Sequence, residues 1–251
     1  VVISGSIVIN KIKLANAIAV VGDTGTGKTS SIMPFEEAGI IGLDPKETFI
    51  INIKDKPLPM KGWRNKYIPI KPGVPPTEGN YFASTDAQDI IKVMSYVGLS
   101  RPDIKNVVLD DGQYVMSEEF MANALKSGYD KFNKMAKNMY DVINTGLHLP
   151  KEKNFILLTH SEENEGKTDI KTLGKMLSDK VNLAGLFTVV LYTNVKTNAA
   201  GSTYSFITNQ HIDDRGVYVM AKSPRGMFSE KLIPNDMGAV LQQMEQYNNA
   251  E

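Results

Sequence analysis

One short run holds the residues of this chain whose types and spacing best suit chemistry: Gly22-Asp-Thr-Gly-Thr-Gly-Lys28-Thr29. It fits G-x-x-x-x-G-K-[ST], the pattern of a loop that wraps phosphate groups. Glycines let the backbone approach phosphate oxygens, while Lys28 reaches the β- and γ-phosphates and Thr29 offers a hydroxyl to Mg²⁺. The run therefore predicts a nucleoside triphosphate site with Mg²⁺. The predicted nucleotide contacts are Gly22, Asp23, Thr24, Gly25, Thr26, Gly27, Lys28, Thr29 and Ser30.

The segments on either side of the loop supply the context that the motif requires. Residues 17–21 (AIAVV) form an apolar run of strand length, and residues 30–38 are predicted to form a helix. A helix start adds unpaired backbone N–H groups and the positive end of the helix dipole. A strand, the loop and a helix in this order favour a phosphate site over a chance glycine-rich turn.

A third strand, predicted at residues 106–111 (NVVLDD), ends in two acids. Asp110 is predicted to hold Mg²⁺ together with Thr29, because a carboxylate at a strand end beside the loop is the expected metal anchor. Asp111 is predicted to orient or deprotonate the attacking water. The alternative is that Asp111 caps the turn that follows it.

Two further residues compete for catalytic roles. Asp55 follows the strand predicted at residues 48–53, and its alternative is a solvated loop acid between two lysines. His160 ends the strand predicted at residues 154–160, where it would sense the γ-phosphate. Its alternative is a structural hydrogen bond. If His160 is a sensor, the loop at 161–169 is expected to change with nucleotide state.

A late basic turn carries the last two candidates. Lys222 and Arg225 flank Pro224 directly after a predicted strand. In ring or filament ATPases such cations reach a neighbouring subunit's nucleotide and neutralise transition-state charge. This hypothesis predicts a homo-oligomer with head-to-tail contacts. A solvated basic turn is the alternative.

The elements that must position these residues alternate between strands and helices, with no internal repeat. This order predicts an α/β fold in one domain over residues 1–251, with a mostly parallel sheet and helices on both faces. A hairpin is expected at 1–15, and a Pro- and Lys-rich surface excursion at 54–80. The other predicted elements are helices at 85–96, 118–145 and 235–247 (capped by Asn235 or Asp236), a strand at 186–192, a loop at 161–172, and a late strand pair at 204–208 and 217–221.

Composition narrows the class of protein. The 251 residues are 42% apolar and 22% charged, with 28 basic and 28 acidic side chains. The charge balance excludes a whole-protein basic field, so contact with nucleic acid would need a local patch. The absence of cysteine excludes disulfides and thiolate metal sites and fits a cytoplasmic location. No apolar run reaches membrane-spanning length, so we expect no membrane partner.

Together, the loop, the Asp110-Asp111 strand end, the Thr-His strand end and the late Lys-Ser-Pro-Arg-Gly turn resemble RecA-like (ASCE) P-loop ATPases of phage genomes. Within that class the chain is similar to the Sak-four-type recombination ATPases. The resemblance covers about residues 17–226 and implies a RecA-like core that binds and hydrolyses ATP with Mg²⁺. It also implies single-stranded DNA and a single-strand-binding protein as partners. The Lys54-Asp55-Lys56 sequence departs from the pattern, which places a glutamate at that strand end.

Three functions compete on the sequence alone. An ATPase acting on DNA in recombination or annealing is the first, and a nucleotide-gated assembly or packaging factor is the second. A small-molecule kinase is the third, but kinases of this type carry an arginine-rich lid, and the four arginines here are scattered. Candidate DNA contacts combine cations with aromatic rings that stack on bases. They are Lys54, Lys56, Lys61, Trp63, Arg64, Lys66 and Tyr67.

Overall fold

A large β-sheet organises the computed structural model, which describes residues 15–70, 78–125, 127–174, 177 and 181–250. The hairpin predicted at 1–15 lies outside this range except for residue 15. The strands of the sheet are β1 (Asn16–Val21), β2 (Thr48–Asn52), β3 (Tyr81–Ala83), β4 (Asn106–Asp110), β5 (Asn154–Thr159), β8 (Val189–Asn198), β9 (Gly201–Ile207) and β12 (Leu232–Pro234). Their order is β12-β9-β8-β1-β5-β4-β2-β3.

Most of this sheet is parallel. β1 pairs in parallel with β5 on one side and β8 on the other, and β4 pairs in parallel with β5 and β2. β5 therefore lies between the strand that leads into the phosphate loop and the strand that ends at Asp110. Because the carboxyl ends of parallel strands meet at one edge, the loop, Asp110 and His160 are brought to the same edge.

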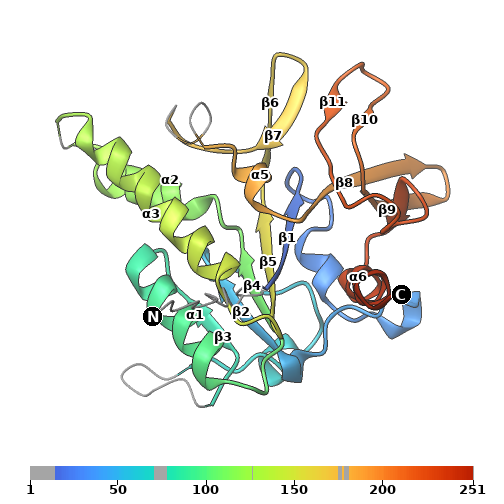
Figure 1. Cartoon of the computed structure of the whole chain (residues 1–251), viewed down its shortest axis with the longest axis horizontal. Helices are drawn as coiled ribbons and strands as arrows, with labels where there is room; N and C mark the ends of the chain where they lie inside the picture. The colour runs from blue at the N-terminus through green and yellow to red at the C-terminus, as the bar shows by residue number, and fades with distance from the viewer. Residues whose placement is uncertain (1–14, 71–77, 126, 175–176, 178–180, 251) are drawn as a thin grey trace, which may run out of the picture.

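Helices cover both faces of the sheet, as predicted (Figure 1). One face carries α1 (Ala87–Ser100), α2 (Tyr114–Ala122) and α3 (Asp130–Leu147), and the other carries α6 (Met237–Asn249). Asp86 caps α1 and Asp236 caps α6 through their side-chain oxygens, so both predicted helix starts are confirmed. A short α5 (Leu183–Leu186) precedes β8.

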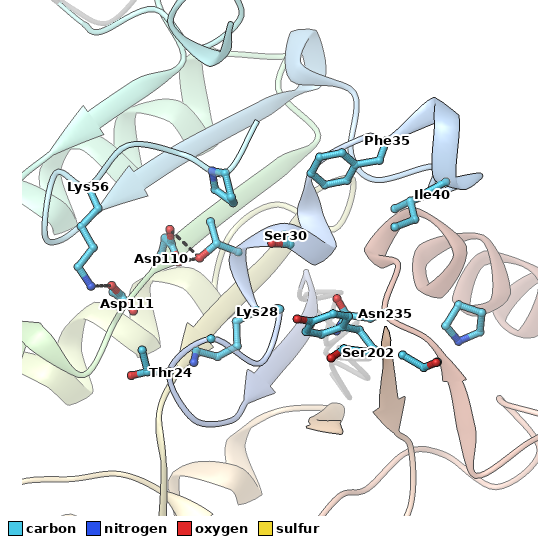
Figure 2. A pocket seen from close by; sticks show the side chains of 18 of the residues that line it. Thr24, Lys28, Ser30, Phe35, Ile40, Lys56, Asp110, Asp111, Ser202 and Asn235 are labelled. Carbon is cyan, nitrogen blue, oxygen red and sulfur yellow. Dashed lines mark hydrogen bonds and ion pairs between the residues drawn. The ribbon is translucent and has the colours of Figure 1, made fainter. Parts of the chain in front are cut away.

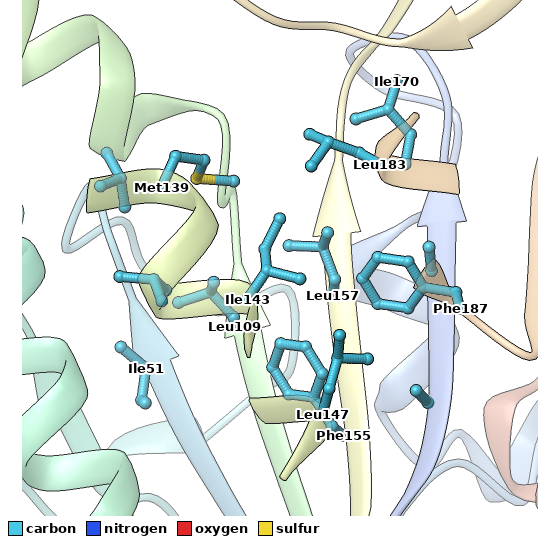
Figure 3. Close-up of a cluster of buried hydrophobic side chains, with 14 of the residues drawn as sticks. Ile51, Leu109, Met139, Ile143, Leu147, Phe155, Leu157, Ile170, Leu183 and Phe187 are labelled. Atoms are coloured by element: carbon cyan, nitrogen blue, oxygen red, sulfur yellow. The ribbon is translucent and has the colours of Figure 1, made fainter. Parts of the chain in front are cut away.

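The core follows from the alternation of side chains along each strand. Ile51, Leu109 and Leu157 join the cluster under α3, where Figure 3 shows them beside Met139 and Ile143. Their chain neighbours face the opposite way and pack with α6. The central strands, which are apolar between their polar ends, are thus buried on both faces, as expected from the sequence for an α/β fold.

The helix predicted directly after the loop does not form. Residues 29–32 and 36–38 make two separate 3₁₀ turns instead. Pro34 is the physical reason, because a proline disfavours helical dihedrals in the residue before it. Met33 accordingly adopts extended dihedrals, with φ −93° and ψ 133°.

Two other predictions need correction. Residues 118–145 form parts of two helices rather than one, and the segment between them contains Gly128 in a left-handed conformation, with φ +93°. The predicted loop at 161–172 contains a hairpin of β6 (Ser161–Asn164) and β7 (Lys167–Ile170). Its turn has positive φ at both Glu165 and Gly166, as tight hairpins require.

Late antiparallel strands are present, but their partners differ from those predicted. β9 pairs with β8 and β12 in the large sheet. The segment near residue 218 forms β11 (Tyr218–Val219), which joins β10 (His211–Ile212), β7 and β6 in a second, four-stranded sheet. The two late segments therefore belong to different sheets.

Candidate functional site

The phosphate-loop sequence lies at the carboxyl edge of β1, directly beside β8. Gly25 and Gly27 have φ of +78° and +90°, dihedrals that residues with a Cβ atom rarely adopt. A Cβ added at Gly22 would lie 1.7 Å from the Thr193 hydroxyl oxygen of β8. That hydroxyl contacts the Thr26 hydroxyl at 2.7 Å, so β8 supports the loop from outside. The glycine spacing thus matches a cradle that requires glycine.

Lys28 turns its ammonium group into the loop. Its Nζ donates to the carbonyl oxygens of Gly22 and Asp23, each at 2.7 Å. An ammonium group has three donors, so one remains for a phosphate oxygen. Burial lowers the pKa of Lys28, while the carboxylates of Asp111 and Asp110 act in the opposite direction.

Thr29 and Asp110 form the oxygen pair that a magnesium ion would need. The Thr29 hydroxyl donates to Asp110 Oδ1 at 3.0 Å, with Oδ2 at 3.3 Å. Hydroxyl and carboxylate oxygens are ligands that Mg²⁺ prefers, so these residues fit the ion. Burial, followed by the charge of Asp111, raises the pKa of Asp110 to about 7.

Asp111 sits at the centre of a polar cluster. Its Oδ2 accepts a hydrogen bond from Lys56 Nζ at 2.7 Å, and its Oδ1 lies 3.6 Å from His160 Nε2. Its backbone φ of +62° is left-handed, a conformation that Asp and Asn tolerate better than most residues. The backbone thus turns sharply between the two acids.

Lys56 and His160 reach this cluster from strand ends on either side. Lys56 follows β2, and its ammonium group lies 5.1 Å from the centre of the Tyr114 ring. His160 meets the same ring edge-on at 6.0 Å. Burial and the nearby charge of Lys28 lower the pKa of His160, which favours its neutral form. Sequence reasoning treated Lys56 as a candidate DNA contact and gave it no place beside the phosphate loop.

Hydrogen bonds also connect the segment around His160 to its surroundings and to the phosphate loop. Gln113 Oε1 accepts from the Thr159 hydroxyl and from the His160 backbone N–H, both at 3.2 Å. One residue further along, the Ser161 hydroxyl donates to Asp23 Oδ1 at 2.7 Å. The hairpin that begins at Ser161 therefore holds the phosphate loop by a direct side-chain contact.

Asp55 lies apart from this cluster. Its carboxylate accepts a hydrogen bond from the Tyr81 hydroxyl at 2.9 Å. It is exposed and does not line the cavity at the phosphate loop, whereas Asp111 does. Of the two acids considered for water activation, the geometry favours Asp111.

Lys222 and Arg225 also lie outside the cavity of their own chain. Lys222 pairs with Val190 of β8 through backbone hydrogen bonds, and its Nζ donates to the Gly185 carbonyl at 3.3 Å. Arg225 is exposed in the following turn. Their predicted action on a neighbouring subunit stays a prediction.

A cavity of about 810 Å³ extends from the phosphate loop to a region that the sequence did not indicate. Figure 2 shows Lys28, Asp110 and Asp111 toward one end and Phe35, Ile40 and Asn235 toward the other. Tyr204, Ser202 and Thr203 of β9 also line it, as does Pro234. These residues come from three distant segments without a shared motif. Sequence reasoning assigned Phe35, Tyr204 and Asn235 structural roles only, in a predicted helix, a predicted strand and a predicted helix cap.

The predicted surface excursion at 54–80 contributes less to a nucleic-acid patch than expected. Tyr67 is fully buried and cannot stack on a base without unfolding, which corrects its assignment as a DNA contact. Lys54 pairs with Glu118, and Lys56 with Asp111. The exposed remainder is Lys61, Arg64 and Lys66, with the Arg64 guanidinium group 4.8 Å from the Trp63 ring centre.

Together, the sheet order, the glycine cradle and the Thr29–Asp110 pair define an α/β protein with a P-loop at the carboxyl edge of a mostly parallel sheet. No family model and no curated protein matches the sequence. Among solved structures the chain is similar to the KaiC-like protein PH0186 from the hyperthermophilic archaeon Pyrococcus horikoshii OT3, with a TM-score of 0.42 and 10% identity over 82% of this chain and 89% of that one. The sheet order and the loop carry the fold assignment.

No helix in the described part of the chain combines the length and apolar character needed to cross a membrane.

Proposed function

We propose that this protein binds ATP and hydrolyses it with Mg²⁺. The observation that carries the proposal is the convergence of Lys28, Asp110 and Asp111 on one cavity at the carboxyl edge of the sheet. A phosphate cradle alone would support binding only. The two acids supply the metal anchor and the water-activating group that hydrolysis requires.

Each residue has a defined task in this reaction. Lys28 and the loop amides hold the phosphate chain, and Thr29 with Asp110 would hold Mg²⁺, which neutralises phosphate charge when bound. Asp111 orients a water and accepts its proton as the water oxygen bonds to the γ-phosphorus and ADP leaves. Lys56, paired with Asp111, adds a second cation beside the developing charge.

The test compares Lys28→Ala with Lys61→Ala. Lys28 faces the loop, whereas Lys61 is an exposed lysine outside the cavity. Phosphate release from ATP should disappear in Lys28→Ala and stay at the wild-type rate in Lys61→Ala, with both proteins retaining the wild-type circular dichroism spectrum. Normal turnover by Lys28→Ala would refute the site.

We further propose that the ATPase acts on single-stranded DNA in recombination or annealing, together with a single-strand-binding protein. The support is the resemblance of the motifs and the exposed cluster of Lys61, Arg64 and Lys66 beside Trp63. Single-stranded DNA should stimulate phosphate release, and replacing the three cations by alanine should remove the stimulation but leave basal turnover. Lys92→Ala, an exposed lysine on α1, serves as the control. Equal rates with and without DNA would contradict this role.

Assembly into a ring or filament is the last part of the proposal, and it follows from the basic turn at Lys222 and Arg225. If Arg225 acts on a neighbour, Arg225→Ala should bind ATP but turn it over slowly. Mixing it with Lys28→Ala should then restore part of the activity, because hybrid contacts pair an intact loop with an intact arginine. A monomer with full activity in light scattering would overturn this part.

A further inference from the structure

We propose that the end of the cavity remote from Asp111 is a nucleobase subsite that selects adenine through the side-chain amide of Asn235. This inference rests on the proposed function, since it assigns a place to the nucleoside part of the bound triphosphate. The cavity extends past Ser30 to Phe35, Ile40 and Asn235, which lie away from Asp111 (Figure 2). Tyr204 also lines it. A phosphate chain alone does not need this room.

The walls of this end have the character of a base-binding slot. Phe35 and Ile40 belong to one turn, closed by backbone hydrogen bonds between them at 3.0 Å. Tyr204 on β9 borders the cavity and is 43% exposed, so it is accessible to a ligand there. Aromatic and apolar side chains around a few placed polar groups are the usual lining of a small-molecule site.

Asn235 supplies the polar group. The residue is only 7% exposed, and its Nδ2 is buried with no hydrogen-bond partner within the described structure. Its Oδ1 lies toward Gly27, 3.0 Å from where a Cβ on that glycine would be. Rotation of the amide exchanges donor and acceptor with almost no change in shape. A ligand that offers both an acceptor and a donor would therefore satisfy a buried group that the protein leaves unpaired.

The chemistry of the amide favours adenine over guanine. Adenine presents N7 as an acceptor next to the N6 amino donor, the pattern to which an Asn amide binds through two hydrogen bonds. Guanine presents two acceptors, N7 and O6, which Arg or Lys matches. Among the described residues at this end of the cavity, none is a lysine or an arginine.

A clamp keeps the subsite in shape. Asp236, next to Asn235, accepts the backbone N–H groups of Ile41 and Gly42 at 2.7 and 2.9 Å. The same carboxylate caps α6 through Gly238 and Ala239. It thereby ties the Phe35–Ile40 turn to the segment that carries Asn235, although the two are about 200 residues apart in the sequence.

The experiment measures the affinity of the whole chain for three probes: the β,γ-imido analogues of ATP and GTP, and inorganic tripolyphosphate. We expect the ATP analogue to bind about 5- to 100-fold more tightly than the GTP analogue. Asn235→Ala should erase this preference. Tripolyphosphate affinity should not change in this variant.

Tyr204 provides an independent arm. Tyr204→Ala should weaken the ATP analogue about tenfold through lost stacking, and Tyr204→Phe should restore its affinity. Tyr218→Ala is the matched control, because Tyr218 is 42% exposed in the second sheet and lies outside the cavity. Equal affinity for the two analogues, or an unchanged preference in Asn235→Ala, would overturn the subsite. If tripolyphosphate still binds in that case, the proposed phosphate site stands. If neither nucleotide nor tripolyphosphate binds, the proposed function fails, and the subsite fails with it.

Discussion

The two ends of the cavity are built in opposite ways. The phosphate end is built on one continuous run, residues 22–29, together with residues from the neighbouring strand ends. The nucleoside end is assembled from a turn near residue 35, one strand near residue 204 and a helix start near residue 235. The phosphate end has a sequence motif because a loop that wraps phosphate needs a particular backbone conformation, which depends on residues close together in the sequence. The nucleoside end exists only when the whole sheet has formed.

The largest effect is expected from Asp111, the proposed water-activating acid at the phosphate end. Asp111→Asn should lower phosphate release by about 10²–10⁴-fold while ATP binding persists, because Asn keeps the left-handed backbone but cannot accept the proton. Asp55→Asn is the matched control, since Asp55 does not line the cavity. Equal turnover in Asp111→Asn and wild type would assign the water to another group.

The next effect belongs to the clamp at the nucleoside end. Asp236→Ala removes the cap of α6 and leaves the backbone N–H groups of residues 41 and 42 without a partner. We expect a loss of about 2–4 kcal/mol in the free energy of unfolding, measured by urea denaturation. ATP should bind more weakly while tripolyphosphate is unaffected. A loss shared equally by both ligands would show that the two ends are not separable.

A smaller effect is expected for the metal anchor. Asp110→Asn replaces a carboxylate by a neutral amide next to Thr29. The Mg²⁺ concentration that supports half-maximal turnover should rise about 10- to 100-fold, the range found when groups that support a metal are altered. Thr24→Ser, a conservative change in the same cavity, is the control. An unchanged Mg²⁺ dependence would place the ion elsewhere.

The smallest effect concerns the support of the loop by β8. Thr193→Val keeps the shape of the side chain and removes the hydroxyl that contacts Thr26. One lost hydrogen bond predicts about 1 kcal/mol, or roughly fivefold, in ATP affinity. Tripolyphosphate should lose the same factor, since the change lies at the phosphate end. A selective loss of ATP affinity would instead connect β8 to the base.

The same contrast explains which features the sequence could predict. The central strands followed from apolar runs, and Asp110, Asp111 and His160 followed from the rule that parallel strands end at one edge. The position of Lys56 beside Asp111 was not predictable, because it depends on the course of the chain after β2. Pro34 disfavours the helix predicted at 30–38, and Gly128 disfavours one continuous helix over 118–145, so both corrections could have been predicted from the sequence.

The remaining misses have a common physical cause. Tyr67 was read as a surface ring because it lies among lysines and prolines, yet it is fully buried. Burial of a residue in an irregular segment depends on packing partners that no local period reveals. Asn235 was recognised only as a possible helix cap for the same reason: its distance from Gly27 is set by the sheet, not by its sequence neighbours.

The position of β1 in the sheet has a consequence for the order of events during synthesis. Ile18 pairs with Val189 in β8, so the strand that carries the phosphate loop acquires its last neighbour 171 residues later. At ~5–20 residues per second, the ribosome needs about 10–30 s to make that stretch. Pairing across such separations is slow to nucleate, because the intervening chain must first be ordered. The phosphate loop is therefore synthesised long before its pocket is complete, and a ligand of that pocket can stabilise the fold only after β8 and the strands that follow it have joined the sheet.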